Sequence, residues 1–409
     1  MHDQLTAIKA KAQAAVDKAA ALGSDLDLSS YDSQVTQDEY SNSCDLSSLP
    51  VQEVQDLLGA GFDASEAGRG GTFMLKDARV LHCSTHSEGI EVIPIKQALQ
   101  EHDWIWDYYW KLVDPGADKY TAAAELDLHD GYVIRALPGH KTIYPIQACL
   151  YMDKNNLQQN VHNILIAEEG SELHIISGCA TSPHLHRGVH VGVSEFFVKK
   201  GATLSFTMIH KWADGVAVRP RSAAVVEEGG LFLSNYVCMK PVNSLQMYPT
   251  AHLNGAGATA RFYSILVGSK VSDLDVGGRT ILNAPGTRAE IVSRAITNGG
   301  KIMARGHLVG NAAGCKAHLE CRGLILGGGE LLAVPQLDGH VEGVEMSHEA
   351  AVGKIAQEEI YYLMSRGLSE EEATATIVRG FLNVDIPGLP AQLKAEIDRA
   401  VSATDAEAM

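Results

Sequence analysis

Glycines recur along the middle of the chain at nearly constant spacing. They stand in polar turns between β-rich runs, and successive gaps measure 31, 31, 28, 28, 29, 28 and 29 residues, at Gly139, Gly170, Gly201, Gly229, Gly257, Gly286, Gly314 and Gly343. Glycine at a fixed offset supplies a turn that needs positive φ or a close backbone approach. A period near 28 residues without a helical pattern between the turns predicts a β-solenoid of stacked coils. The alternative is a β-sandwich with coincidental spacing, because glycine is frequent here (39 residues).

Residues after each of these glycines alternate between apolar and polar. The third and fifth positions are often apolar, as at Leu173 and Ile175, and the second and fourth are often polar, as at Glu172 and His174. This alternation is typical of strands with one buried face. By the same count, Cys321 lies seven residues after Gly314, in the inward-facing set.

The two ends of the chain differ from the middle. We expect a mainly β protein organised as an N-terminal helical region (1–70), a mixed strand and helix lead-in (71–130), a β-helix core (131–345) and a C-terminal helical lobe (346–409). Helices are predicted at 4–22, within 49–62, at 95–113 and at 357–366. A capping box of Ser369 and Glu372 begins the next helix. A last helix carries Leu393, Ile397 and Val401.

Charge and motifs exclude several classes of function. The formal net charge of −17 over 409 residues argues against nucleic acid and anionic lipid as partners. The chain has neither an apolar run long enough to span a membrane nor a signal-peptide core, so we expect a cytoplasmic protein. Seven cysteines without a CxxC pair argue against a disulfide framework and a zinc ribbon. No phosphate-binding loop is present, so the chain should not hydrolyse nucleotide by itself.

A histidine-rich stretch, HLHRGVH, offers one candidate metal site. It contains His184, His186 and His190. HxH on a strand would point two imidazoles to one face, a geometry that suits zinc or iron and resembles the cupin motif. The alternative interpretation is a histidine-rich surface loop after Pro183.

The second candidate combines Cys321 with the dipeptide His348-Glu349. Taken alone, an inward-facing cysteine is more often a small core residue than a ligand. A His-Glu pair before a helix is more often a cap or a solvated pair. Adjacent residues of an extended segment point to opposite sides, so His348 and Glu349 should not both face Cys321 of their own chain.

Four stretches resemble the SufB/SufD family of iron–sulfur cluster assembly scaffolds. They are DGYVIRALPGHKTIYPIQACLYM (130–152), NILIAEEGSELHIISGC with VHVGVSEFFVKKGATLSFTMIHKW (163–179 and 189–212), AGCKAHLECRGLILGGG (313–329) and the signature that begins SHEAAVGKIAQEEIYYLMSRGLSEEEA (347–373). The resemblance implies a right-handed parallel β-helix with helical termini, which agrees with the glycine period. The N-terminal hundred or so residues match poorly.

The resemblance also implies a site and a role. SufB-type chains have Glu-His-Glu-Ala and SufD-type chains Ser-His-Gly-Ala where this chain has Ser347-His348-Glu349-Ala350. Cys321 stands at the position of the SufB-type assembly cysteine. The family builds a nascent cluster at the SufB–SufD interface from such side chains. One chain that holds Cys321, His348 and Glu349 is therefore expected to act as a homodimeric scaffold, similar to the minimal SmsB type, and not as an enzyme.

Further expectations follow from the same resemblance. The cargo is a transient [2Fe–2S] or [4Fe–4S] cluster, passed to apo iron–sulfur acceptors. Cys179 matches a SufB-type cysteine that lines the helix interior and is a candidate for sulfur relay. The C-terminal lobe is expected to dock a SufC/SmsC-like ABC-type ATPase, through Tyr361, Tyr362 and Met364. The alternatives are a carbohydrate-active β-helix enzyme, for which no paired-acid stripe is found, and a cupin-like metal protein built on HLHRGVH.

Overall fold

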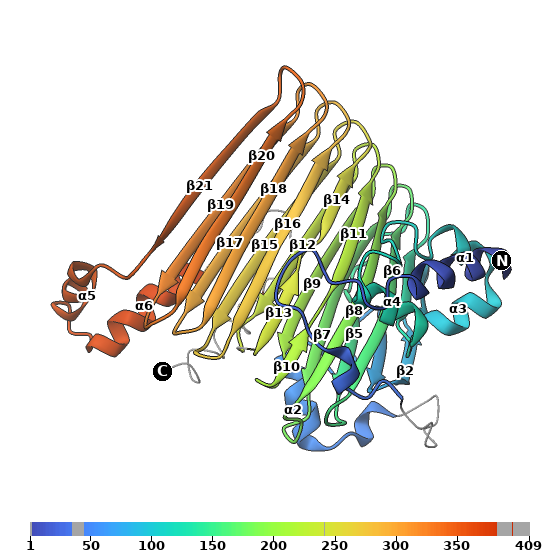
Figure 1. Ribbon diagram of the computed structural model, residues 1–409, viewed down its shortest axis with the longest axis horizontal. Helices are drawn as coiled ribbons and strands as arrows, with labels where there is room; N and C mark the ends of the chain where they lie inside the picture. The colour runs from blue at the N-terminus through green and yellow to red at the C-terminus, as the bar shows by residue number, and fades with distance from the viewer. Residues whose placement is uncertain (1, 35–44, 241, 383–394, 396–409) are drawn as a thin grey trace.

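The chain forms a parallel β-solenoid of about eight turns with helices at both ends (Figure 1). The computed structural model describes residues 2–34, 45–240, 242–382 and 395. The mainly β solenoid predicted from the glycine period is confirmed. The predicted last helix, with Leu393, Ile397 and Val401, lies outside the described residues.

Successive strands alternate between two sheets that face each other. Sheet 1 has the order β2 (Arg79–Thr85), β1 (Gly71–Lys76), β5 (Ile146–Met152), β7 (Glu172–Thr181), β9 (Thr203–Lys211), β12 (Leu231–Cys238), β15 (Thr259–Gly268), β17 (Arg288–Thr297), β19 (Lys316–Ile325) and β21 (Glu345–Gly353). Its neighbours pair in parallel except β1 with β2. The final strand, β21, therefore forms an edge of the sheet.

Sheet 2 follows the same coils on the opposite side. Its order is β10 (Val216–Val218), β13 (Ser244–Met247), β16 (Asp273–Leu282), β14 (Thr250–Leu253), β11 (Arg221–Val226), β8 (Gly188–Val198), β6 (Gln158–Ala167), β4 (Tyr132–Ala136) and β3 (Ile90–Pro94). β18 (Lys301–Gly310) pairs with β16 and with β20 (Glu330–Gly339). Only β3 and β4 pair antiparallel among these described strands.

The periodic glycines share one conformation. All eight have φ between 63° and 78°, the left-handed region that L side chains rarely adopt. An added Cβ at Gly170, Gly201 or Gly229 would meet nothing within 4 Å, so the requirement comes from φ and not from space. The N–H of Gly201 donates to the carbonyl of Glu228 in the next coil, at 2.8 Å, and Gly229 continues the pattern. Most of these glycines thus turn one coil and join it to the next.

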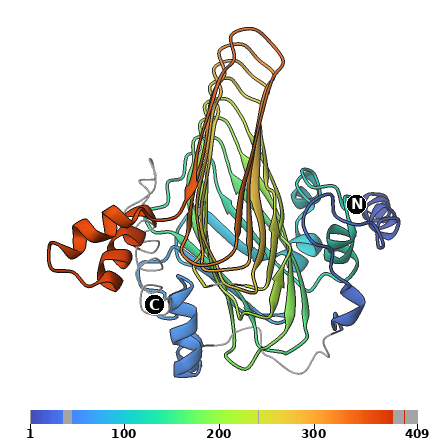
Figure 2. The ribbon, with the colours of Figure 1, turned by 60° about the vertical axis from the view of Figure 1, so that its left-hand side comes forward.

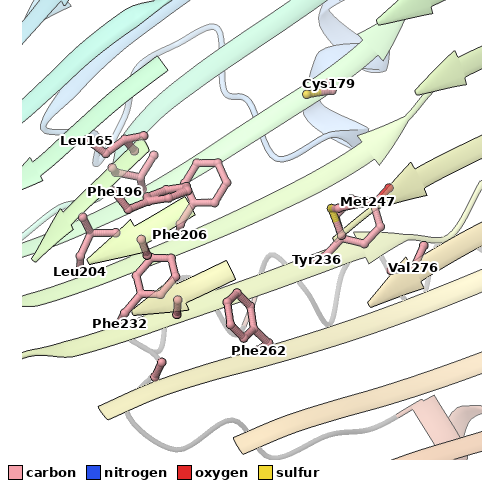
Figure 3. Packing of buried hydrophobic residues seen from close by; sticks show 14 of the residues in the cluster. Leu165, Cys179, Phe196, Leu204, Phe206, Phe232, Tyr236, Met247, Phe262 and Val276 are labelled. Atoms are coloured by element: carbon pink, nitrogen blue, oxygen red, sulfur yellow. The ribbon is translucent and has the colours of Figure 1, made fainter. Parts of the chain in front are cut away.

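The interior between the sheets is filled by apolar side chains. Phe196 of sheet 2 packs against Phe206 and Phe232 of sheet 1, with ring centroids 5.0 Å apart in both pairs, and Phe262 continues the stack (Figure 3). Side chains from both sheets are buried in one continuous core. This packing accounts for the alternation of apolar and polar residues along the strands.

Helices cover the outside of the solenoid on opposite sides (Figure 2). On sheet 2 lie α1 (His2–Gln13), α3 (Ile95–Glu101), the 3₁₀ helix η3 (Asp103–Asp107) and α4 (Lys119–Leu126). Further elements are η1 (Leu28–Ser30), η2 (Leu46–Ser48) and α2 (Val51–Gly59).

The helix predicted within 49–62 is confirmed as α2. The one predicted at 4–22 is shorter, because the chain beyond Gln13 leaves the helix and the carbonyl of Lys18 accepts from Lys119 N–H at 2.8 Å.

The predicted helix at 95–113 is wrong over its second half. Only α3 and η3 form, and Trp110 has a positive φ of 54°. Buried Glu195 of β8 accepts hydrogen bonds from the backbone N–H of Trp110 at 2.7 Å and of Leu112 and Val113 at 2.5 and 3.0 Å. A carboxylate that binds these groups replaces the helical carbonyl acceptors, so the chain wraps around Glu195 instead.

The helix predicted at 357–366 is confirmed and begins at Gln357, but the C-terminal helical lobe as a whole begins later than residue 346. Residues 345–353 form β21, so the expected boundary at 346 falls inside a strand, and α5 (Gln357–Met364) and α6 (Glu370–Leu382) follow. The capping box is confirmed: Ser369 N–H donates to Glu372 Oε2 at 2.8 Å, and Glu372 N–H to Ser369 Oγ at 3.2 Å. α6 packs its apolar face on the outside of sheet 1. None of the helices in the described part of the chain has the length and apolar character that crossing a bilayer needs.

Candidate functional site

Cys321 lies on β19 and points into the solenoid. It is 2% exposed, and it pairs in register with Ser293 of β17 and with Ala350 of β21. Burial and the neighbouring Glu320 raise the pKa of its thiol to about 11, against the opposing effect of Arg294. The thiol is therefore protonated at neutral pH, because the nearby Arg294 does not offset burial.

His348 and Glu349 lie on β21, the strand next to Cys321. His348 pairs with Leu319 and Glu349 with Glu320. Because side chains alternate along a strand, His348 shares the inward-facing set with Cys321, two positions away, and Glu349 belongs to the outer face. Both are exposed, since β21 is the last strand of its sheet. The dipeptide is thus part of the final coil and does not cap a helix.

An alternating row of charges holds Glu349 on the outer face. Arg294 Nη1 lies 2.6 Å and Arg322 Nε 2.7 Å from Glu320 Oε1, and Arg322 Nη2 lies 3.2 Å from Glu349 Oε1. These contacts are ion pairs across three neighbouring strands of sheet 1. Sequence reasoning missed the row, although Arg322 and Glu320 flank Cys321 directly.

One chain does not assemble a complete metal site. Among the described residues, no three His, Cys, Asp or Glu side chains are arranged to hold a metal ion. Cys321 and His348 lie on the same side of neighbouring strands, while Glu349 faces away. A ligand set of all three residues therefore needs either movement of β21 or side chains from a second chain.

The histidines of HLHRGVH do not converge. His184 and His186 are exposed in the loop before β8, and His190 is buried within β8. His190 Nδ1 lies 2.8 Å from Gln159 Oε1, and burial lowers the pKa of His190 to about 3. The HxH pair is not on a strand, so the geometry expected of a cupin-like site is absent from this stretch.

Cys179 belongs to a polar column inside the solenoid. It is 1% exposed and pairs with His210 of β9, which pairs in turn with Cys238 of β12. All three stand nine residues after a periodic glycine, so the period itself could have identified His210. His210 Nδ1 lies 2.8 Å from the Tyr236 hydroxyl, and its Nε2 is buried without a partner. Burial raises the pKa of Cys179 well above its usual range.

Several coils of the buried core separate Cys179 from Cys321. Five strand spacings lie between β7 and β19, a distance of about 24 Å at ~4.8 Å per spacing. Figure 3 shows Cys179 at one side of the labelled core, with Tyr236 and Met247 nearby and Phe262 beyond. An apolar cavity of about 40 Å³ lies among these side chains. It is wide enough for a few water-sized atoms at most.

The exposed side chains of α5 lie on the outside of the C-terminal lobe. Tyr361 is 60%, Tyr362 59% and Met364 38% exposed, while Ile360 is buried. Arg366 stacks over the Tyr362 ring at 5.3 Å. Both tyrosines therefore present most of their side chain to solvent and not to the solenoid of their own chain.

Comparisons with known proteins identify relatives along most of the chain. Residues 150–381 match the family model described as "SUF system FeS cluster assembly, SufBD core domain". An iron–sulfur cluster assembly SufBD family protein of Archaeoglobus fulgidus is 49% identical over 84% of this chain and 93% of its own. One of Methanothermobacter thermautotrophicus (strain Delta H) is 45% identical over 95% and 96%. One of Staphylococcus aureus (strain MRSA252) is 33% identical over 77% and 68%.

Proposed function

Because the chain belongs to the SufBD family of iron–sulfur cluster assembly proteins, we propose that it is a homodimeric scaffold on which a nascent cluster is built. The site takes Cys321, His348 and Glu349 from the last coils of two chains. The observation that carries the proposal is the position of Cys321 and His348 on neighbouring strands at the open end of the solenoid. The cluster is the cargo of this site and leaves for an apo acceptor protein.

The end of the solenoid supports a dimer. Among the described strands, β20 and β21 lie at sheet edges, and proteins normally cover or pair such edges. Large apolar side chains are exposed on and between them: Leu332 is 50%, Val341 43% and Val352 41% exposed. A two-fold interface uses the same patch on both chains and so doubles every ligand at the seam.

The ligand types suit a cluster that must be released. Four thiolates would hold iron and sulfide tightly, whereas carboxylate and imidazole are harder ligands that suit exchange. Cys321 must lose its proton when it binds iron, and its raised pKa opposes this until the metal arrives. The buried thiol is therefore protected from oxidation before iron enters.

A partner ATPase supplies the energy in this proposal. The exposed Tyr361, Tyr362 and Met364 form an aromatic and thioether surface of the kind enriched in interface cores. Residues 354–356 alone separate β21 from α5. A partner that closes on ATP and moves α5 would pull on the strand that carries His348 and Glu349, and so shift the site between two states.

Cys179 takes the role of a sulfur relay in this proposal. Its pairing with His210 places a thiol beside an imidazole of the next coil, inside the solenoid. Passage to Cys321 requires the buried core between them to open. The raised pKa of Cys179 means that a neighbouring base must take its proton before the thiol can carry sulfur.

Anaerobic reconstitution with iron and sulfide tests the proposed function. Wild type should form a brown, thiol-dependent chromophore, and Cys321→Ser should lose it while keeping its fold by circular dichroism, because a hydroxyl binds soft iron–sulfur centres poorly. Cys238→Ser is the matched control: its thiol is equally buried and donates weakly to the Lys240 carbonyl at 3.5 Å. Equal yields from the two variants would make Cys321 a packing residue and sink the proposal.

A further inference from the structure

A cleft lies between the outer face of sheet 2 and the N-terminal segment that crosses it. Its volume is about 530 Å³. The strands contribute the small side chains of Ala223 and Thr250, and the facing wall contributes Leu22, Leu112 and Val113. A hydrogen bond of 3.0 Å from Arg219 Nη2 to the carbonyl of Ser24 fixes the N-terminal segment to the solenoid. Clefts of this size commonly hold small organic molecules.

Arg279 of β16 lies in this cleft without a counter-charge. It stands in register between Thr250 of β14 and His307 of β18, all on the outer face of sheet 2. Within the described part of the chain, its guanidinium forms no ion pair and no side-chain hydrogen bond, and its Nε is buried without a partner. A cation held partly out of water without an acceptor is costly, and such a group calls for an explanation such as a bound ion.

The other two arginines of the cleft each have a carboxylate as counter-charge. Arg305 binds Asp275 through two hydrogen bonds of 2.5 and 3.0 Å, and Arg221 Nε donates to Asp118 at 2.7 Å. Asp and Glu outnumber Lys and Arg by 50 to 33 in this chain, so acidic partners are plentiful. Among the described arginines that line the cleft, Arg279 is therefore the one whose positive charge is not neutralised.

Two neutral side chains, His252 and Tyr248, line the cleft together with that charge. Burial, and then Arg279 itself, hold the pKa of His252 below its usual value, so its imidazole is uncharged at neutral pH. Tyr248 contributes a hydroxyl to the same cleft, and His307 is paired with Asp338 at 2.7 Å. One cation with neutral hydrogen-bond donors matches a ligand that carries a single anionic group.

We propose that this cleft binds a small organic anion whose phosphate or carboxylate group contacts Arg279 and whose apolar part lies against Leu112 and Val113. Carboxylate is planar and phosphate is tetrahedral, but both present a pair of oxygens that can accept hydrogen bonds from a guanidinium group. Binding here is independent of Cys321, His348 and Glu349, and it needs no cluster on the protein.

Calorimetric titration of the full chain with phenyl phosphate, benzoate and inorganic phosphate tests the proposal. We expect an organic anion to bind more tightly than inorganic phosphate, because the apolar wall adds contacts; the stronger of the two organic probes identifies the anionic group. Arg279→Gln should weaken binding at least tenfold, and Arg279→Lys by less. The control is Arg288→Gln, which removes an exposed arginine of sheet 1.

The pKa of His252, followed by NMR, provides a second measurement. A bound anion neutralises Arg279 and should raise the pKa of His252 in wild type, whereas Arg279→Gln should raise it without ligand and abolish the ligand response. The proposal is overturned if none of the probes binds at millimolar concentration. It is equally overturned if Arg279→Gln binds like wild type, or if Arg288→Gln loses as much affinity.

Discussion

Arg322 and Glu349 form an ion pair of 3.2 Å across the last two strands of sheet 1, on the face opposite to Cys321. In the single chain, Glu349 is therefore oriented away from the thiol of its own chain. The pair is also the outermost link of the row that runs back through Glu320 to Arg294.

The row predicts unequal effects of two charge removals on stability. Arg322 and Glu349 are 43% and 55% exposed, so Arg322→Gln should lower the free energy of unfolding by less than about 1 kcal/mol. Glu320 is 15% exposed and separates two guanidinium groups, so Glu320→Gln should cost about 1–3 kcal/mol. Denaturant unfolding of the two variants measures both values. A larger loss for Arg322→Gln would show that the row does not act as described.

The burial of Cys321 predicts slow alkylation at neutral pH. Because its pKa is raised to about 11, the thiolate fraction and the rate of modification by iodoacetamide should rise until the pH passes that value. Arg294→Gln removes the opposing cation and should shift the profile to still higher pH. Peptide mapping by mass spectrometry reads Cys321 separately from the other thiols. A fast reaction at pH 7 that is unaffected by Arg294→Gln would contradict this prediction.

The raised pKa of Cys321 also predicts how the stability of the folded chain changes with pH. The Cys321 thiol holds its proton more tightly in the folded chain than at its ordinary value of 9.0. Its contribution to stability is complete below about pH 9 and is lost as the pH rises through about 11. Cys321→Ser should therefore reduce the alkaline loss of stability in that window.

The periodic glycines predict a conformational penalty for side chains. At Gly229, φ is 64° and an added Cβ meets no atom, so Gly229→Ala should destabilise the chain by about 1–2 kcal/mol through backbone strain alone. Gly229→Asn should cost less, because asparagine tolerates this region. Gly328→Ala is the control, since Gly328 has equal space but no positive φ. Thermal unfolding compares the three; equal midpoints for Gly229→Ala and Gly328→Ala would refute the argument.

The coil period was predictable because it depends on local chemistry. Each turn needs one residue with positive φ, and glycine supplies it at a fixed distance along the chain, so the period of the fold is the period of the glycines. The inward position of Cys321 followed from the same count and is confirmed. So is the opposite orientation of His348 and Glu349.

The misread elements depend on residues far away in sequence. The chain near Trp110 leaves the helix because Glu195, 85 positions later, accepts its N–H. The segment around Ser347 reads as the start of a helix, with alanine and glutamate, yet it pairs with β19 along its length. Neither Glu195 nor β19 lies close enough in the sequence to be part of a local pattern around these segments. The unpaired Arg279 is likewise visible only once the coils are stacked.

The exposed end of the solenoid predicts a charge-sensitive dimer. Val352 is 41% exposed on edge strand β21, so Val352→Lys should place a charge in the proposed seam and raise the dissociation constant at least tenfold. Val271 is 62% exposed in a turn between β15 and β16, and Val271→Lys is the matched control. Light scattering across micromolar concentrations measures the change. A wild-type monomer at these concentrations, or dimers of equal strength from both variants, would contradict the proposed interface.

The two exposed tyrosines of α5 are the predicted docking surface for the ABC-type ATPase that we propose as a partner. Tyr361 and Tyr362 are about 100° apart on the helix, and each exposes more than half of its side chain. Replacing a central aromatic of an interface by alanine commonly costs 2 kcal/mol or more, so each variant should bind the ABC-type ATPase roughly thirtyfold more weakly. Both side chains are mostly exposed in the single chain, so their removal should keep the melting temperature within a few degrees of wild type.

The control for general surface effects is Val51→Ala, because Val51 is 75% exposed at the start of α2. Pull-down and calorimetry with the ATPase measure the affinities. If Tyr361→Ala and Tyr362→Ala bind as wild type does, and a folded chain truncated before Gln357 does too, the partner docks elsewhere and α5 cannot be the element through which ATP binding moves β21.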